Sequence, residues 1–215
     1  MLSIGEYAQR AGISARAVRY RIADGSLPAR KIGGRWVIDG DHRPPQTRRA
    51  GRKLSAASFD LLAAFMDGDD AGMTPDARRR ARERAHRIGD GGVEQVREFS
   101  RRPDVIVGTY RTSAQDLEEL RHDARLHLTG ISHPDAEVYG PVLDAYVSPS
   151  DHAHIELFHM LEPVPRSAAN VTLRMQNPPP RVRKLHLIAD LLDDGDPRSQ
   201  HEAELMLNRL MQAMR

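Results

Sequence analysis

The segment ISARAVRYRIADGSLPARKIGGRWVI, residues 13–38, concentrates basic side chains in a short stretch of chain. Its first half has the periodicity of a helix, because Val18 and Ile22 lie about one turn apart on a single apolar face. Its second half has two short runs on either side of Gly33-Gly34, which is typical of a hairpin with a tight primed turn. The segment therefore predicts a basic helix followed by a two-stranded hairpin.

A second helix is expected directly before this segment. Ser3 and Glu6 have the spacing of a capping box, in which each side chain satisfies a free backbone N–H of the first turn. The apolar residues that follow at helical spacing are Ile4, Tyr7, Ala8 and Ala11. Gly12 suits the left-handed position that ends such a helix, and Ser14 suits the cap of the next one. Two helices joined by a short glycine turn are typical of the helix-turn-helix unit that reads DNA.

In this interpretation one face of the second helix is available for DNA. If Val18 and Ile22 face the first helix, residues 16 and 20 point away from it. Arginine can hold a guanine edge with two hydrogen bonds, so an arginine-bearing face suits the major groove. The residues of this helix that we predict to bind DNA are Ser14, Ala15, Arg16, Arg19 and Tyr20. The alternatives are a solvated surface for the arginines and a packing role for the tyrosine.

The hairpin supplies three further candidates. Lys31 and Arg35 lie on either side of the turn, where their charges suit contacts with DNA phosphates. Trp36, the only tryptophan, is included among the predicted DNA-binding residues because its indole edge can reach outward. Its main expected role is to stack the hairpin on the small core.

The order of these features resembles the winged helix-turn-helix of the excisionase and MerR superfamily. The matching motifs are L-S-x-x-E-x-A at 2–8, G-I-S at 12–14, D-G-x-L-P at 24–28 and R-W at 35–36. The resemblance covers about a fifth of the chain. It implies that the helix after the turn enters the major groove and that the wing contacts the DNA backbone or the minor groove. By position, these roles fall on the helix and hairpin residues named above.

Charge is distributed unevenly along the chain. The net charge is only +2, but residues 1–55 hold 12 Lys and Arg against 4 Asp and Glu, whereas residues 56–215 hold 20 against 26. A compact basic segment attached to an acidic body suggests that the N-terminus binds a polyanion. The alternative is an arginine-rich surface that is only solvated.

Composition and missing motifs exclude or disfavour several protein classes. The absence of cysteine excludes disulfides, thiolate metal sites and a cysteine nucleophile. No apolar run approaches the ~20 residues that span a bilayer, and no signal peptide is recognisable, so we expect a cytoplasmic protein without membrane contact. Common nucleophile and nucleotide-binding motifs are also missing. We therefore expect no enzymatic activity, no catalytic residues and no cofactor.

The expected organisation is α+β, in three parts and a linker. Residues 1–40 form the winged helix-turn-helix, and residues 41–54, rich in proline and arginine, form a basic linker. Residues 55–102 form a helical connector. Residues 103–215 form a mixed α/β domain, because short strand-like and helix-like stretches alternate there. This domain is expected to bind a partner.

Two helices are expected in the connector. The first, near residues 55–67, has an apolar stripe that consists of Phe59, Leu62, Ala63 and Met66. Thr74-Pro75-Asp76 is a strong start signal for the second, ARRRARERAHRI, which carries six arginines. This arginine helix is either a second phosphate-binding surface or a solvated helix with Arg–Glu pairs around Glu83, and the second interpretation is favoured. One more short helix is expected at 92–101.

The last part alternates between the two kinds of element. The strand-like runs are VIVGTY, RLHLT, LDAYV and NVTLRM, beginning at residues 105, 125, 143 and 170. Helix-like stretches are 113–123, 150–161 and 185–192. Asp196-Pro197 opens a final helix, whose expected apolar positions are Leu205, Leu207, Leu210 and Met214.

Histidines cluster near Asp151, but their spacing does not suit a metal. His154 and His159 are five residues apart, whereas a helical zinc pair needs four. We therefore predict no metal site in this chain.

Short motifs within residues 53–210 resemble actinobacterial AbiE-type abortive-infection antitoxins and related transcriptional regulators. They are KLSAASFDLLAAFMDGDD, HLTGIS, DAYVSPSD, NVTLRM and IADLLDDGDPRS. Such antitoxins pair a winged N-terminal domain with a C-terminal domain that opposes a nucleotidyltransferase toxin. The present N-terminus departs from the usual reader of that family because it is excisionase-like. The resemblance implies a cognate nucleotidyltransferase-type toxin as a partner.

These observations together predict a sequence-specific regulator of transcription that binds double-stranded DNA. The leading context is an antitoxin that represses its own operon, with the C-terminal domain binding the toxin or a second copy in a homodimer. The alternatives are an excisionase-like architectural factor of a mobile element and a ligand-sensing MerR-like regulator.

Overall fold

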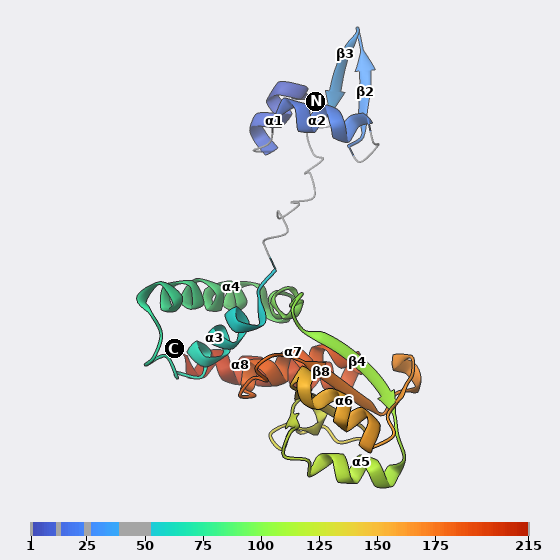
Figure 1. The fold of residues 1–215 in the computed structure, drawn as a ribbon. Coiled ribbons are helices and arrows are strands. Elements are labelled where there is room, and N and C mark those ends of the chain that lie inside the picture. Colours follow the sequence, from blue (N-terminus) through green and yellow to red (C-terminus); the bar gives the residue numbers. More distant parts are fainter. Residues whose placement is uncertain (1, 12–13, 24–26, 39–52, 215) are drawn as a thin grey trace. The chain divides into compact units, whose positions relative to one another are not determined.

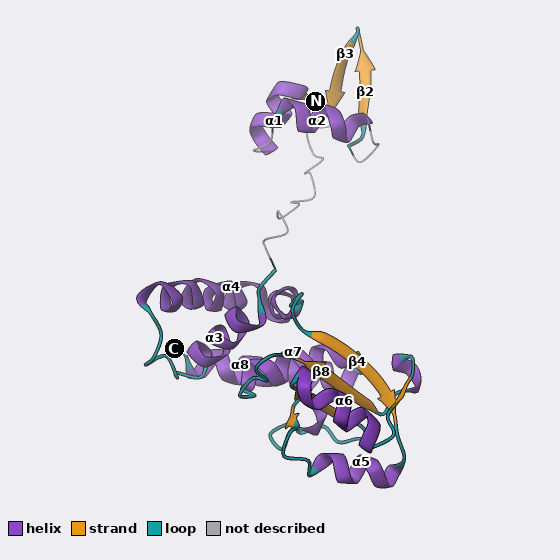
Figure 2. Cartoon of the chain, viewed as in Figure 1, coloured by secondary structure: helices purple, strands orange, loops and turns teal. Residues whose placement is uncertain are grey.

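The computed structural model describes residues 2–11, 14–23, 27–38 and 53–214. The fold is α+β, as expected, with two separate sheets (Figures 1 and 2). The chain divides into two compact units, residues 1–52 and residues 53–215. The predicted turn residues Gly12 and Ile13, and most of the predicted linker, lie outside the described residues.

The N-terminal unit contains two helices and a small antiparallel sheet. The helices are α1 (Ile4–Ala11) and α2 (Ala15–Ala23). The hairpin strands β2 (Ala29–Ile32) and β3 (Arg35–Ile38) are joined by β1 (Leu2–Ser3) in the order β1-β3-β2. The expected helices and hairpin are thus present, whereas β1 was not anticipated.

The start and the core of this unit follow the sequence pattern. The backbone N–H of Ser3 donates to Glu6 Oε2 at 2.7 Å, and the N–H of Glu6 donates to Ser3 Oγ at 3.3 Å, so the predicted capping box is confirmed. The buried core consists of Tyr7, Ala8, Val18, Leu27 and Ile38. Because Val18 faces this core, the opposite face of α2 is left to solvent.

The C-terminal unit has a helical core. α3 (Ala56–Met66) and α4 (Pro75–Ser100) pack with α7 (Lys184–Asp194) and α8 (Pro197–Ala213). The predicted stripe on α3 is buried, and Leu54, assigned to the linker from the sequence, packs into the same core. The expected connector therefore shares its apolar contacts with the end of the chain, and the expected boundary between residues 102 and 103 does not separate two compact units.

Most helix starts in this unit are capped at the residues that the sequence indicates. Ser55, Thr74 and Asp196 each accept a hydrogen bond from a backbone N–H of the first turn of their helix. Within α4, Gly92 has φ 57° and ψ −145°, so the element consists of two helical segments, as the separate helix expected at 92–101 implies. On α8, Leu205 is 37% exposed, so its expected burial is wrong.

A five-stranded sheet forms the rest of the unit. Its strands are β4 (Ile106–Arg111), β5 (His127–Leu128), β6 (Leu143–Val147), β7 (Glu162–Pro163) and β8 (Val171–Met175). They are ordered β5-β6-β8-β4-β7, with β6 and β8 parallel and the other pairs antiparallel. The remaining helices are α5 (Ala114–Arg121), α6 (Pro149–Phe158) and the 3-10 turns η1 (Gly130–Ser132) and η2 (Arg166–Ala168).

The two faces of this sheet have different chemistry. Alternate residues of β6 and β8, such as Ala145 and Leu173, pack with apolar side chains from α5 and α6. The intervening residues point to the other face, where Tyr146 and Arg174 meet Asp190 of α7. The sheet thus separates an apolar layer from a buried polar layer.

Candidate nucleic-acid interface

The exposed face of α2 carries three of the predicted DNA-binding side chains. Arg16, Arg19 and Tyr20 are exposed, and Tyr20 is 72% accessible to solvent. At about 100° per residue, Arg16 and Tyr20 lie on the side of the helix opposite the fully buried Val18, and Arg19 flanks them. A large aromatic ring left in water between two arginines is unusual for a packing residue, and it places a hydroxyl donor on the basic face.

The start of α2 confirms the predicted cap and shows the packing of two residues that were also predicted to bind DNA. Ser14 Oγ accepts a hydrogen bond from the backbone N–H of Ala17 at 3.2 Å, so this hydroxyl caps the helix. Ala15 is half-buried and packs against the small core. Of the five residues predicted on α2, the structure therefore brings three together on the exposed face and uses the other two for the helix start and the core.

The hairpin presents its basic residues on two faces. Gly33 and Gly34 have φ values of +55° and +82°, which fits the tight primed turn that the glycine pair predicts. Lys31 pairs with Trp36, whereas Arg35 pairs with Ile32. Because side chains alternate along a strand, Lys31 and Arg35 lie on opposite faces of the hairpin.

The register also reveals a basic residue that the sequence interpretation left out. Arg30 pairs with Val37, so it shares a face with Arg35, and both side chains are exposed. The alternation of a two-residue hairpin was the available signal, since positions 30 and 35 fall on one face once the turn is placed at the glycine pair. One face of the hairpin therefore offers two guanidinium groups.

Trp36 does not stack on the small core as expected. Its side chain is 39% exposed, although Ile38, two residues further along the same face of β3, is fully buried. The core of this small unit ends at Ile38, and Trp36 lies closer to the hairpin tip, beside Lys31. The indole is thus an exposed aromatic group next to a lysine.

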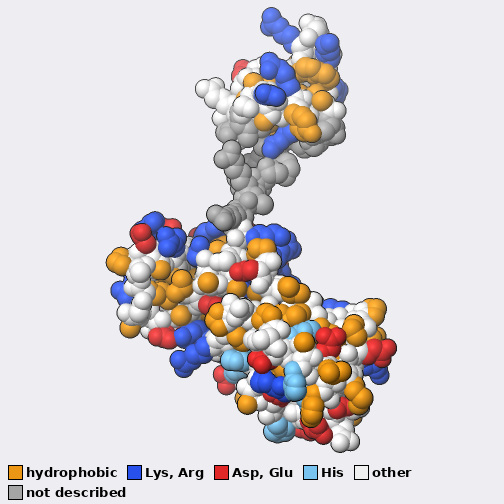
Figure 3. Space-filling model, viewed as in Figure 1, with side chains coloured by type: hydrophobic (Ala, Val, Ile, Leu, Met, Phe, Trp, Pro, Cys, Tyr) orange, Lys and Arg blue, Asp and Glu red, His pale blue; other side chains and the backbone are white. Residues whose placement is uncertain are grey.

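Four basic side chains of this unit are free to meet an external anion. Lys and Arg side chains are exposed at the hairpin tip and over the helices (Figure 3). Within the described part of the unit, Arg16, Arg19, Lys31 and Arg35 have no ion-pair or hydrogen-bond partner. Unpaired arginines on two neighbouring elements create a positive field that a polyanion can neutralise.

The arginine helix of the C-terminal unit is different, because several of its charges are paired. Arg79 lies 2.8 Å from Glu83 at the i,i+4 spacing, so the expected pair is present. Arg78 contacts Asp70 at 2.8 Å, and Arg87 lies 3.7 Å from Glu98. Burial lowers the pKa of Arg84, with neighbouring arginines contributing.

A buried ionic cluster lies between the sheet and α7. Arg174 holds Asp144 through two hydrogen bonds of 3.0 Å and also approaches Asp190 at 3.3 Å and Asp193 at 3.1 Å. Burial raises the pKa of Asp144 to about 6, although Arg174 opposes the shift. Arg174 thus contacts three carboxylates, two of which also contact a second arginine, and the cluster ties α7 to the sheet.

The histidines near Asp151 do not form the cluster that their sequence proximity suggested. His152 lies 2.7 Å from the Tyr110 hydroxyl, and His154 stacks on Phe158. His159 turns instead toward α5, where it lies near Asp116. The sequence could not indicate this meeting, because the two positions are far apart in the chain.

Comparisons with known proteins leave the chain without an assigned relative. No family model, no curated protein and no solved structure matches it. Across the described residues, no helix combines the length and the apolar character that a membrane crossing requires. Functional inference therefore rests on the geometry of the chain itself.

Proposed function

We propose that this chain is a sequence-specific regulator of transcription that binds double-stranded DNA through its N-terminal unit. The observation that carries the proposal is the exposed face of α2, where Arg16 and Tyr20 lie opposite the buried Val18 and Arg19 flanks them. A basic helix that presents unpaired arginines beside a basic hairpin suits a winged helix-turn-helix reader.

In this proposal the two elements have separate roles. α2 lies in the major groove, where Arg16 and Arg19 donate hydrogen bonds to base edges. The hairpin is the wing, and Arg35, Arg30 and Lys31 neutralise phosphates. Trp36, which is exposed beside Lys31, adds an apolar surface against the sugar-phosphate backbone.

The biological context that we favour is an antitoxin that represses its own operon, with a nucleotidyltransferase-type toxin or a second copy bound by the C-terminal unit. The resemblance of motifs in residues 53–210 to AbiE-type antitoxins supports this context. A toxin reading frame beside the gene would support it further, whereas a recombinase frame would favour an architectural factor of a mobile element.

One feature of the C-terminal unit favours a second candidate function, that of a ligand-sensing regulator. A cavity of about 340 Å³ is lined by Phe65, Ala85, Met211 and Met214, with Arg82 and His86 at its polar side. This volume lies at the lower end of small-molecule pockets. DNA binding by the N-terminal unit is common to both candidates.

The test is a selection of bound sites from a pool of random duplex DNA with the full chain. We expect one enriched motif, present once or as an inverted pair, and the inverted pair would indicate a dimer. An Arg16→Ala/Arg19→Ala variant should enrich no motif. Arg209→Ala, which removes an exposed charge from the other unit, should enrich the same motif as the unaltered chain. Absence of any enriched motif with the unaltered chain would refute the proposal.

A further inference from the structure

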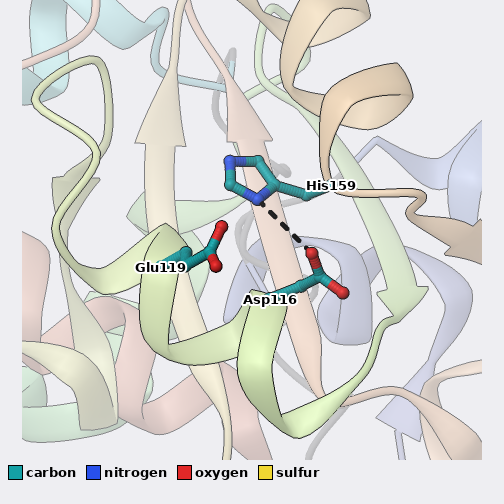
Figure 4. A group of neighbouring side chains, drawn as sticks. All are labelled: Asp116, Glu119 and His159. Atoms are coloured by element: carbon teal, nitrogen blue, oxygen red, sulfur yellow. Dashed lines mark ion pairs between the residues drawn. The ribbon is translucent and has the colours of Figure 1, made fainter.

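Two carboxylates and one imidazole meet where α5 faces the end of α6. Asp116 and Glu119 are three residues apart on α5, so they lie on the same side of that helix. His159 is the residue that ends α6. One ligand atom from each of the three side chains lies within 4.8 Å of the other two (Figure 4).

His159 points an unpartnered nitrogen into this group. Its side chain is only 4% exposed, and Nδ1 is buried without a hydrogen-bond partner among the described residues. The nearest carboxylate oxygen, Oδ1 of Asp116, is 3.9 Å away, which is too far for a hydrogen bond. Buried polar atoms in folded proteins are almost always paired, so this nitrogen indicates a ligand held between the side chains.

The other ring nitrogen of His159 lies on the side of a third carboxylate. Nε2 of His159 lies 3.8 Å from Oδ2 of Asp123. Arg125 holds this carboxylate in place, because its backbone N–H and its Nε each donate a hydrogen bond of 2.9 Å to Oδ1 of Asp123. A carboxylate on this side of the imidazole favours a proton on Nε2, which leaves the lone pair of Nδ1 available to a metal.

The two carboxylates are also oriented for coordination. Ser113 Oγ donates to Oδ2 of Asp116 at 2.5 Å, which anchors that side chain and leaves Oδ1 directed at His159. Glu119 is exposed, and among the described residues the only hydrogen bond to its side chain is a long one of 3.3 Å from Gln115. The glutamate can therefore rotate to complete a coordination shell.

We propose that Asp116, Glu119 and Nδ1 of His159 bind a divalent transition-metal ion, with zinc as the best fit. One imidazole nitrogen and two carboxylate oxygens are ligands that zinc accepts, and three protein ligands leave a fourth position open to water or another molecule. Donor atoms around tetrahedral zinc lie about 3.4 Å apart, so the group must contract by about 1 Å. Rotation of the exposed Glu119 supplies most of this movement.

This site differs from the one that the histidine spacing argued against. His154 and His159 lack the spacing of a zinc pair on one helix, whereas His159 meets two carboxylates from α5 in the structure. The proposed site lies wholly in the C-terminal unit and does not depend on DNA binding.

The experiment is titration of the full chain, freed of metal with a chelator, with zinc in a calorimeter and with cobalt in a spectrophotometer. We expect one tightly bound zinc per chain, and a visible cobalt spectrum of a four- or five-coordinate ion. Glu119→Gln should weaken zinc binding by at least about tenfold, as should His159→Gln. Glu118→Gln, the exposed neighbour that faces Arg121, should bind like the unaltered chain.

The variants separate loss of the site from loss of the fold. Glu119 is exposed, so Glu119→Gln should unfold at the same temperature as the unaltered metal-free chain. His159 is buried, and its variant is interpreted only if its thermal unfolding is also cooperative. Failure of the unaltered chain to bind zinc, or equal binding by Glu119→Gln, would overturn the proposal, because the ion would then be absent or held elsewhere.

Discussion

At the scale of single residues, Arg16 and Arg19 differ from Lys31 and Arg35 in the element that carries them. The first pair projects from the exposed face of a helix, and the second pair from the two faces of a narrow hairpin. A helix fits the major groove, where donors meet base edges that differ between sequences. A hairpin at the flank meets phosphates, which are the same in every sequence.

We therefore predict two distinct phenotypes for alanine substitutions. Arg16→Ala or Arg19→Ala should cost about 1–3 kcal/mol at the selected site and relax the preference at a particular base pair. Lys31→Ala or Arg35→Ala should weaken binding to all sequences alike and lower the salt slope by about one unit each. The measurement is affinity for the site and its single-base variants at several salt concentrations. If both helix variants keep the unaltered ranking of base variants, α2 is not the recognition helix.

A second prediction concerns Asp144 in the buried cluster. Burial, reinforced by Asp190, raises its pKa to about 6, above the value of 3.8 expected in the unfolded chain. The folded state thus holds this proton more tightly, so the contribution to stability is fully present below about pH 4 and declines as the pH rises through 6. The decline amounts to at most about 3 kcal/mol.

This dependence can be isolated by substitution. Asp144→Asn cannot titrate, so urea unfolding of this variant between pH 4 and 7 should lack the decline seen in the unaltered chain. Asp193→Asn provides a control at the same cluster, because Asp193 is only partly buried and its pKa is lowered. An unchanged profile in Asp144→Asn would assign the pH dependence to other groups.

At the scale of elements, local signals predicted starts and periods well. Ser55, Thr74 and Asp196 cap helices because a short polar side chain bonds to an N–H two or three residues away, which depends on nearby sequence alone. The runs at 143–147 and 171–175 form strands. Apolar residues recur at every second position in both runs, which is the period of a strand with one apolar face.

Features that depend on distant partners were not predictable in the same way. The parallel pairing of β6 with β8 joins segments separated by α6 and β7, and no local pattern specifies that order. β7 has only two residues and contains Pro163, so it lacks a strand signature. Trp36 is exposed because its strand extends past the core, and Leu205 because it lies on the outer face of α8, which the residue type alone does not indicate.

The candidate sites also differ in whether nearby sequence could predict them. The exposed face of α2 was predictable, because helical periodicity places residues 16 and 20 opposite Val18, with residue 19 beside them, once one buried position is known. The group of Asp116, Glu119 and His159 was not, because it forms only when α5 and the end of α6 pack on the same face of the sheet. Arg30 is an intermediate case, since its place follows from the hairpin register.

At the scale of the whole molecule, the two compact units have opposite charge. Residues 1–52 hold 11 Lys and Arg against 4 Asp and Glu, whereas residues 53–215 hold 21 against 26. Each unit has its own apolar core within the described residues. An acidic body repels DNA at a distance, so the proposed DNA binding requires the basic unit.

Removal of residues 1–52 should therefore abolish DNA binding without unfolding the remainder. The fragment 53–215 keeps the sheet and the helical core, including Leu54, which lies just before α3. Its thermal unfolding should therefore remain cooperative. Its affinity for the selected site should be no greater than its affinity for unrelated duplex DNA at every salt concentration. Site-specific binding by this fragment would place the recognition surface on the C-terminal unit, with the arginines of α4 as the first positions to substitute. Retention of zinc by the same fragment would show that the metal site and the DNA interface belong to separate units, because its three ligands all lie beyond residue 52.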